Sequence, residues 1–168
     1  MDYNKITAQN DEIEKAFNKY ANMVRRICYI YLRNQSDVED TFQEVFLKLI
    51  TTEKKFNSDE HEKAWICRVT INKCKDISKS FSRTHTCSLE DAEELSSEDK
   101  VETDVMEAVL SLPTKLKDVI YLFYYQNYTA AEIAQILDQK ENTVYSHLHR
   151  AKKLLRKKLG GYQNEQLF

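Results

Sequence analysis

Apolar residues recur at intervals of three and four near the C-terminal end of the chain. The residues of this stripe are Val144, Leu148, Ala151, Leu155 and Leu159. Such spacing places their side chains on one side of a helix running from about Asn142 to Leu159. Polar and basic residues occupy the other side, among them Tyr145, His149 and Arg156. The pattern therefore predicts an amphipathic helix with an apolar back and a cationic front.

A short helix is predicted to precede the amphipathic one. Thr129 and Glu132 have the spacing of a capping box, and Ile133 to Leu137 continues the helical pattern up to a four-residue break. From Asn142 to Gly160 the chain holds six Lys and Arg residues and no Asp or Glu. A capped helix, a turn and a cationic helix suit insertion into a DNA major groove, so nucleic acid is the leading partner.

The N-terminal half predicts further helices. One covers residues 11–33, and a second is opened by a capping box formed by Ser36 and Glu39. Apolar residues occupy one face of this second helix: Val38, Phe42, Val45, Phe46, Leu49 and Ile50. Its exposed side is polar and acidic, with Asp40, Gln43 and Glu44. We expect that side to face outwards.

A third helix is predicted from about Glu62 to Ser80, after a polar loop at Phe56–Lys63 in which Asp59 is the candidate cap. Four polar residues of this helix share one face and form a basic ridge: Arg68, Asn72, Lys75 and Lys79. Cys67 and Cys74 belong to the opposite, packed stripe with Ala64 and Ile71. Trp65 is expected to pack in the core rather than to stack on a base.

The whole chain is predicted to be all-α, because its 168 residues include only two glycines and one proline. Residues 83–100 are polar and have little apolar periodicity, which is typical of a flexible linker. A helix resumes at Val101, and Pro113 can occupy the first turn of the next one, which extends to about Gln126. We therefore expect two small helical domains, 10–82 and 101–160, joined by an acidic linker.

Charge is distributed in blocks that nearly cancel to a net charge of −2. Residues 37–62 hold eight acids and three bases, whereas residues 63–83 hold six bases and one acid. Residues 88–107 hold nine acids and one base. Because like charges are grouped, the blocks indicate separate roles along the chain.

Several classes of protein are excluded. No apolar run approaches the roughly 18 residues that a membrane span needs, so we expect a cytoplasmic protein without membrane insertion. The four cysteines lack C-x-x-C spacing, and His85 with Cys87 is too sparse a set, so no metal and no cofactor are expected. There is no Gly-rich phosphate loop, nucleophile motif or acid–base cluster, which excludes an enzyme.

Two separated segments resemble one bacterial family. DVEDTFQEVFLKL (residues 37–49) and AWICRVTINKCKD (residues 64–76) resemble region 2 of sigma-70-type factors. The stretch from Ser111 to Leu159 resembles their region 4. Since only a short acidic linker separates the two, the chain is similar to the extracytoplasmic-function (ECF) subgroup. The resemblance implies a promoter-specificity subunit of RNA polymerase with no catalytic activity.

The resemblance also implies roles for residues of region 2. Asp40, Gln43 and Glu44 match positions that bind a coiled coil of the polymerase clamp, and an acidic surface would orient this encounter. The loop at Phe56–Lys63 matches the loop that reads the promoter −10 element as single-stranded DNA. The residues that would bind this strand are Arg68, Asn72, Lys75 and Lys79, with Asn72 near a flipped base.

Region 4 is expected to read the −35 element as duplex DNA. The residues that match DNA-facing positions are Asn142, Thr143, Tyr145, Ser146, His149, Arg150, Lys152 and Lys153. Arg150 could contact either guanine or a phosphate, whereas Lys152 and Lys153 would contact phosphates. Asp138 replaces the usual glycine of the turn and Gln139 an apolar residue, and Asn142 is expected to start the recognition helix in place of Lys140.

One alternative function remains open on the sequence: a helix-turn-helix regulator that binds DNA without joining polymerase. The family resemblance also implies a sequestering partner, an anti-sigma factor. The acidic linker could shield the cationic helix in the free protein, or it could serve only as a soluble tether.

Overall fold

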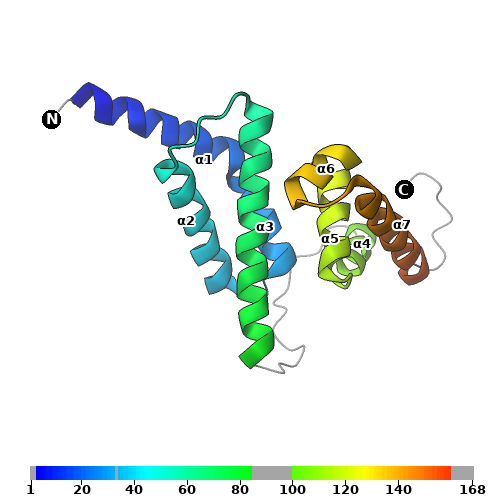
Figure 1. The fold of residues 1–168 in the computed structure, drawn as a ribbon. Helices are drawn as coiled ribbons and strands as arrows, with labels where there is room; N and C mark the ends of the chain where they lie inside the picture. Colours follow the sequence, from blue (N-terminus) through cyan, green and yellow to red (C-terminus); the bar gives the residue numbers. More distant parts are fainter. Residues whose placement is uncertain (1–2, 33, 85–99, 160–168) are drawn as a thin grey trace. The chain divides into compact units, whose positions relative to one another are not determined.

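The computed structural model describes residues 3–32, 34–84 and 100–159, and every regular element in these ranges is a helix (Figure 1). The chain divides into two compact units, Met1–Ala92 and Glu93–Phe168. The all-α fold class is therefore confirmed. The limits of the two domains stay predictions, and residues 85–99 of the predicted linker, with His85 and Cys87, lie outside the described residues.

The first unit contains α1 (Tyr3–Tyr31), α2 (Gln35–Thr51) and α3 (Asp59–Thr84), each in contact with the other two. Each helix buries an apolar stripe against its neighbours because its apolar residues recur at three- and four-residue spacing. Fully buried members of this core are Val24, Ile27, Val45, Ile66 and Ile71. Burial of such side chains is the main stabilising contribution to a bundle of this size.

Three cysteines lie in this core, as the sequence predicts for Cys67 and Cys74. Cys28, Cys67 and Cys74 are all fully buried, and each is a thiol rather than part of a disulfide. The sulfur of Cys67 lies 3.4 Å from the Met23 sulfur, and the sulfur of Cys74 lies 4.0 Å from that of Cys28. These thiols pack α1 against α3. In the described part of the chain, no group of three or more His, Cys, Asp and Glu residues could hold a metal ion.

The starts of α2 and α3 differ from their sequence predictions. Asn34, not Ser36, caps α2, because the Asn34 side chain accepts a 2.8 Å hydrogen bond from the Ser36 amide. Similarly, Ser58 Oγ accepts from the His61 amide at 3.2 Å, so Ser58 and not Asp59 caps α3. Asx and hydroxyl side chains are both favoured at this position, because their oxygen accepts from an amide of the first helical turn. As a result α3 starts at Asp59, and the loop before it shortens to residues 52–58.

Two further expectations for the first unit need correction. The first helix starts at Tyr3, well before residue 11, and ends at Tyr31. Trp65 is only half-buried, and its ring lies 5.4 Å from that of Phe56. Trp65 therefore packs against the loop that precedes α3 rather than in the core. A large aromatic ring at the edge of a helical bundle is partly buried by the loop that packs over it, here through Phe56.

The second unit contains α4 (Lys100–Leu110), α5 (Thr114–Ile120), the π-helical turn η1 (Tyr121–Tyr125), α6 (Ala130–Leu137) and α7 (Glu141–Lys158). Its core takes residues from each of α5, α6 and α7. The fully buried ones include Val119, Ile133, Val144 and Leu155. The pair α6–α7 forms the helix-turn-helix, and α5 also packs against α7.

Helix boundaries in the second unit follow local signals for the most part. The capping box is confirmed, since Thr129 and Glu132 exchange hydrogen bonds in both directions. Asp138 ends α6 in the left-handed region with φ 53°, in the position where the resemblance expects glycine. Two expectations were wrong: Pro113 precedes α5 as its cap residue, and α7 starts at Glu141 rather than Asn142.

Lys140 takes the N-cap position of α7 without any side-chain hydrogen bond. Helix α7 therefore starts without a capping side chain, directly after the turn in which Asp138 has left-handed backbone. Among the described residues no helix is long and apolar enough to cross a membrane.

Candidate functional sites

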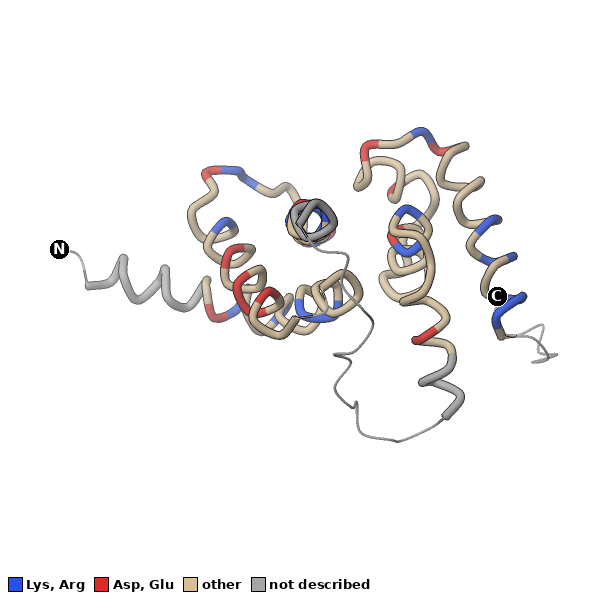
Figure 2. Tube along the Cα trace, turned by 90° about the horizontal axis from the view of Figure 1, so that it is seen from below, with Lys and Arg blue, Asp and Glu red and all other residues tan. Residues whose placement is uncertain are grey.

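The acidic surface predicted on the second helix lies on α2. Asp40, Gln43 and Glu44 are all exposed, while Val45 and Phe46 on the opposite side are buried. The helix period thus turns these three polar side chains to solvent. Glu44 also forms an ion pair with Lys73 of α3. Figure 2 shows the acidic positions that recur along this unit.

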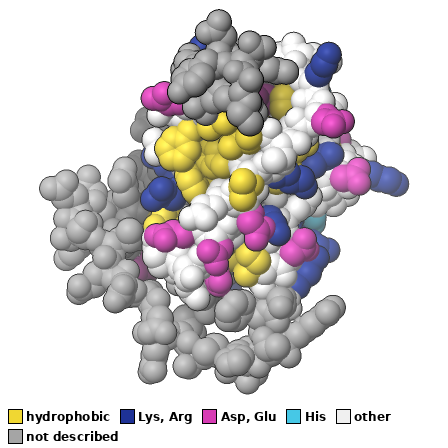
Figure 3. Space-filling view, turned by 90° about the vertical axis from the view of Figure 1, so that its left-hand side faces the viewer, with side chains coloured by type: hydrophobic (Ala, Val, Ile, Leu, Met, Phe, Trp, Pro, Cys, Tyr) yellow, Lys and Arg dark blue, Asp and Glu magenta, His cyan; other side chains and the backbone are white. Residues whose placement is uncertain are grey.

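An aromatic cluster lies between α1 and α2 at the surface of this unit. The rings of Phe17, Phe42 and Phe46 have centroids 4.9–5.7 Å apart, and the Arg25 guanidinium lies 4.9 Å from the Phe42 ring centroid. Phe17 is 43% exposed, and Leu47 of α2 is 60% exposed. Figure 3 shows hydrophobic side chains gathered beside acidic ones on a face of the molecule. The sequence did not identify this cluster, because Phe17 and Phe42 come from different helices.

The basic ridge predicted on the third helix lies on α3. Arg68, Asn72 and Lys79 are exposed and Lys75 is half-buried. Since they span eleven residues of helix, the ridge is about 16 Å long. Lys79 lies 3.8 Å from Asp76 on the same helix, an exposed pair that contributes little to stability. The ridge offers cationic groups at intervals that suit a phosphate backbone.

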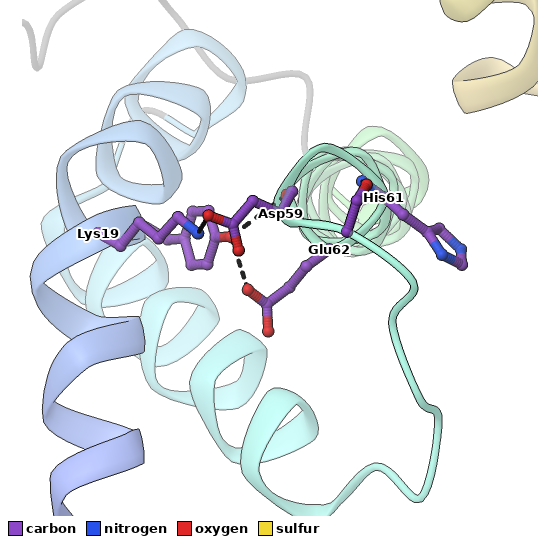
Figure 4. A network of polar contacts seen from close by, with 6 residues as sticks. Lys19, Asp59, His61 and Glu62 are labelled. Carbon is purple, nitrogen blue, oxygen red and sulfur yellow. Dashed lines mark hydrogen bonds and ion pairs between the residues drawn. The ribbon is translucent and has the colours of Figure 1, made fainter.

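The first turn of α3, which follows the loop of residues 52–58, contacts α1, as Figure 4 shows. Lys19 Nζ lies 2.6 Å from Asp59 Oδ2. The Tyr20 hydroxyl donates a 2.6 Å hydrogen bond to Glu62 Oε2. Burial, followed by this bond to a carboxylate, raises the pKa of Tyr20 to about 12. The phenol therefore stays protonated and keeps donating at neutral pH.

These contacts change the interpretation of the acidic loop. Asp59 and Glu62 belong to α3 and engage Lys19 and Tyr20, so their charges are partly compensated by α1. The hydrogen bond with Asp59 raises the pKa of the Lys19 ammonium, which therefore stays charged. No sequence pattern indicates pairs that are about forty residues apart, and these contacts were missed.

The cationic front of the recognition helix lies on α7. Tyr145 is 56% exposed, and Asn142, Ser146, His149, Arg150 and Lys153 are exposed as well. Thr143 is half-buried. The Ser146 hydroxyl donates a hydrogen bond to the Asn142 carbonyl oxygen at 2.9 Å. This oxygen would compete with any external acceptor for the hydroxyl proton. Figure 2 shows basic residues following one another towards the end of α7.

Lys152 differs from its basic neighbours on α7. Its Nζ lies 5.8 Å from the Phe123 ring centroid and 5.6 Å from that of Tyr124, and its side chain is half-buried. These distances fit a cation–π contact with the π-helical turn η1. Lys152 thus connects α7 to η1.

His147 lies on the same helix with a half-buried side chain. Burial lowers its pKa, and the nearby Lys115 and Arg150 charges lower it further. The imidazole is therefore neutral at physiological pH and adds no charge to the cationic front.

Comparisons with known proteins agree with this geometry. Residues 16–84 match the family described as Sigma-70 region 2, and residues 102–155 match Sigma-70, region 4. The chain is similar to RNA polymerase sigma factor SigV of Bacillus subtilis, with 31% identity over 78% of this chain and 81% of the relative. It is also similar to ECF RNA polymerase sigma factor SigM of Mycobacterium tuberculosis, with 26% identity over 88% of this chain and 76% of the relative.

Solved structures show the same fold. The sigma factor RpoE, solved in complex with the anti-sigma factor NepR from Bartonella quintana, matches with a TM-score of 0.73. This match covers 90% of our chain and 99% of RpoE at 16% identity. CnrH, solved with the cytosolic domain of CnrY, matches with a TM-score of 0.64 at 18% identity, over 89% of our chain and 88% of CnrH.

The two matched regions, in this order in one chain, define a sigma-70-type factor. The chain belongs to the ECF subgroup of the sigma-70 family, and it is a promoter-specificity subunit of RNA polymerase and not an enzyme. The alternative of a regulator that acts without polymerase is not favoured, because it leaves the region 2 match unexplained.

Proposed function

We propose that this sigma factor divides its work between its two units, with polymerase and the opened −10 strand bound by the first and the −35 duplex bound by the second. The observation that carries this proposal is the contrast between exposed polar surfaces. An acidic face lies on α2, a basic ridge on α3 and a cationic front on α7. Each surface has the charge that its expected partner would attract.

The α2 face is the proposed contact with the clamp coiled coil of core polymerase. Asp40, Gln43 and Glu44 are exposed there, and the neighbouring Leu47 would add apolar contact area. Polar side chains that surround an exposed apolar side chain are typical of protein interfaces, which have an apolar core and a polar rim.

A polymerase pull-down tests this contact. Changing Asp40, Gln43 and Glu44 together to Ala is expected to weaken core binding at least tenfold, because charge complementarity is lost. Lys73→Ala is the matched control, since it removes the ion pair of Glu44 but leaves the carboxylate in place. Core binding that is indifferent to the triple change would refute the assignment.

The α3 ridge is the proposed binding surface for the melted −10 strand. Arg68, Lys75 and Lys79 would contact phosphates, and Asn72 would contact an extruded base. Phe56 of the preceding loop and Trp65 of α3 itself add aromatic surface near the ridge. Binding of holoenzyme to single-stranded −10 oligonucleotides would fall in Asn72→Ala at one base position, and in Lys79→Ala at all positions alike.

The α7 front is the proposed binding surface for the −35 duplex. Asn142, Thr143, Tyr145 and Ser146 lie in its first two turns, where recognition helices contact base edges. The residues beyond them, proposed to contact the −35 DNA further along the helix, are His149, Arg150, Lys152 and Lys153. Footprinting of holoenzyme on a promoter library would reveal both elements together.

An anti-sigma factor and a cytoplasmic site of action are part of the same proposal. RpoE and CnrH, which share this fold, were both solved with a partner, described for RpoE as an anti-sigma factor. The exposed Phe17 and Leu47 side chains give the free protein an apolar surface that such a partner would cover. Affinity capture from the native host, followed by loss of transcription on adding the captured protein, would test this.

A further inference from the structure

The loop of residues 52–58 runs from α2 to α3, and its C-terminal end is attached to α3. The Phe56 ring lies 5.4 Å from Trp65 and 5.6 Å from His61. His61 Nδ1 accepts from the Asn57 amide at 3.4 Å, and Ser58 caps the helix that follows. The loop is thereby attached to the first turns of α3, so its position depends on where α3 starts in space.

The start of α3 is in turn held by its contact with α1, which Figure 4 shows. Tyr20 is 2% exposed, and its hydroxyl lies 2.6 Å from Glu62 Oε2 and 3.5 Å from the Asp59 carbonyl oxygen. Lys19 lies over the Tyr20 ring at 5.1 Å from its centroid and pairs with the Asp59 carboxylate. Two adjacent residues of α1 thus bind two residues in the first turn of α3, one through an ion pair and one through a hydrogen bond.

Of these two contacts, the one from Tyr20 has a buried donor. A hydrogen bond from a buried phenol to a carboxylate is among the stronger side-chain contacts. The Lys19–Asp59 pair is more exposed, so its contribution is smaller and depends on salt. Together they fix the direction in which α3 leaves the loop, because each constrains a different residue of the same helical turn.

We infer that Lys19 and Tyr20 of α1 are positioning residues for promoter selectivity, setting the geometry with which loop 52–58 and the start of α3 meet the −10 strand. The inference rests on the proposed binding of the −10 strand at α3, which this loop adjoins. Neither residue needs to touch DNA. Base discrimination depends on groups held within a fraction of an ångström, so a shift of the loop lowers selectivity before it lowers overall affinity.

Tyr20→Phe is the primary test, since it removes one hydroxyl and retains the ring. Holoenzyme made from core polymerase and the full chain would select from a pool of single-stranded −10 oligonucleotides. We expect the ratio between the best and worst base at the most selective position to fall about three- to tenfold, as expected for one strong hydrogen bond. Core affinity and the −35 profile should not change.

Tyr29→Phe is the matched control for this substitution. Tyr29 lies on the same helix, and its hydroxyl donates to Gln35 at the start of α2 rather than to α3. The −10 profile of Tyr29→Phe should equal that of the wild type. Loss of selectivity in both variants would indicate general loosening of α1 and would overturn the inference.

A charge reversal tests Lys19 separately. Lys19→Glu should lower −10 selectivity at low salt, and Lys19→Glu combined with Asp59→Lys should restore it, because the pair is rebuilt in the opposite sense. Lys15→Glu, at an exposed site one turn earlier on α1, controls for the change of net charge. A reversal that fails to rescue, while Lys15→Glu behaves like wild type, would overturn the role of this pair.

The outcomes separate this inference from the proposed function. A wild-type holoenzyme that selects no −10 sequence would overturn the proposed function, and the inference with it. A selective wild type with an unaltered Tyr20→Phe profile would overturn the inference alone. If Tyr20→Phe lowers the unfolding midpoint but leaves the profile unchanged, the contact is structural only, which also overturns the inference.

Discussion

The two units hold their functional surfaces in different ways. In the second unit, the start and turn of the helix-turn-helix depend on residues close in sequence, such as Thr129 and Glu132, three residues apart. In the first unit, the loop before α3 is held by residues far apart, such as Tyr20 and Glu62, separated by 42 positions. The proposed −35 surface on α7 is thus shaped locally, whereas the proposed −10 surface on α3 depends on how three helices pack.

The two surfaces should therefore be sensitive to mutations at different places. A locally shaped helix responds to changes in its own caps and stripe. A loop fixed through another helix responds to changes on that helix, even at residues that never meet the ligand.

The largest effect is expected from Leu155→Ala in α7. Leu155 is fully buried, so its truncation should destabilise the second unit by about 2–5 kcal/mol. Trp65, the single tryptophan, lies in the first unit and reports on that unit alone. Denaturation followed by circular dichroism should show an earlier transition, whereas Trp65 fluorescence should not. Leu154→Ala, at a neighbouring site that is 37% exposed, is the control.

If Leu155→Ala shifts the Trp65 transition as much as the circular dichroism transition, the units unfold together and the comparison fails.

Tyr145→Ala should lower discrimination between −35 sequences by about 1–2 kcal/mol, because Tyr145 is exposed near the start of α7 where base edges are contacted. Lys153→Ala should instead weaken binding to all duplexes alike. The slope of log affinity against log salt should fall by about one, as expected when one phosphate contact is lost. Fluorescence anisotropy with matched and mismatched duplexes at several salt concentrations measures both. Equal behaviour of the two variants would contradict the division between base and phosphate contacts.

Thr129→Ala should destabilise the second unit by about 1 kcal/mol, since it removes the capping oxygen of α6. Thr114→Ala is the control, because Thr114 follows the cap position of α5 and that cap has no side-chain hydrogen bond. Urea denaturation of the full chain measures the difference. Equal losses in both variants would mean that the capping box does not shape the start of the helix-turn-helix.

Asp138→Gly should stabilise the second unit by about 0.5 kcal/mol, because glycine relieves the left-handed backbone at φ 53° while adding entropy to the unfolded chain. Asn127, at φ 58°, is the comparison site, and Asn127→Gly should gain less since asparagine tolerates this region better. Thermal unfolding compares the two variants. A loss of stability in Asp138→Gly would show that its side chain has a structural role in the turn.

Acid should weaken the second unit slightly through Glu132. The Thr129 amide and hydroxyl donate to its carboxylate and lower the pKa of Glu132 below 4.5 in the folded state. A lowered folded pKa contributes stability above the unfolded pKa and loses it as the pH falls through the folded pKa. Stability measured between pH 6 and pH 3 should therefore fall less in Glu132→Gln than in the wild type.

Much of the architecture could be predicted because it depends on periodicity. The stripe on α7 is confirmed by the burial of Val144, Leu148, Ala151 and Leu155, and the packing of Cys67 and Cys74 is confirmed as well. Boundaries were less predictable. Asn34 and Ser58 cap their helices although Ser36 and Asp59 are comparably good candidates by residue type.

The candidate sites divide in the same way. Exposure of Asp40, Gln43 and Glu44 follows from the helix period, and so does that of the α7 front. By contrast, the contact of Lys152 with the rings of η1 could not be foreseen, because the π-helical turn that places those rings has no sequence signal that we recognised.

The sequence by itself determined the helical class, the helix-turn-helix, the charge of each surface and the family of the protein. Periodicity and capping act over a few residues, so they can be derived from the order of residues alone. The tertiary structure decided which distant residues meet: Phe17 with Phe42, Glu44 with Lys73, and Tyr20 with Glu62. Such contacts depend on how α1, α2 and α3 pack, and helix packing is set by the whole core at once.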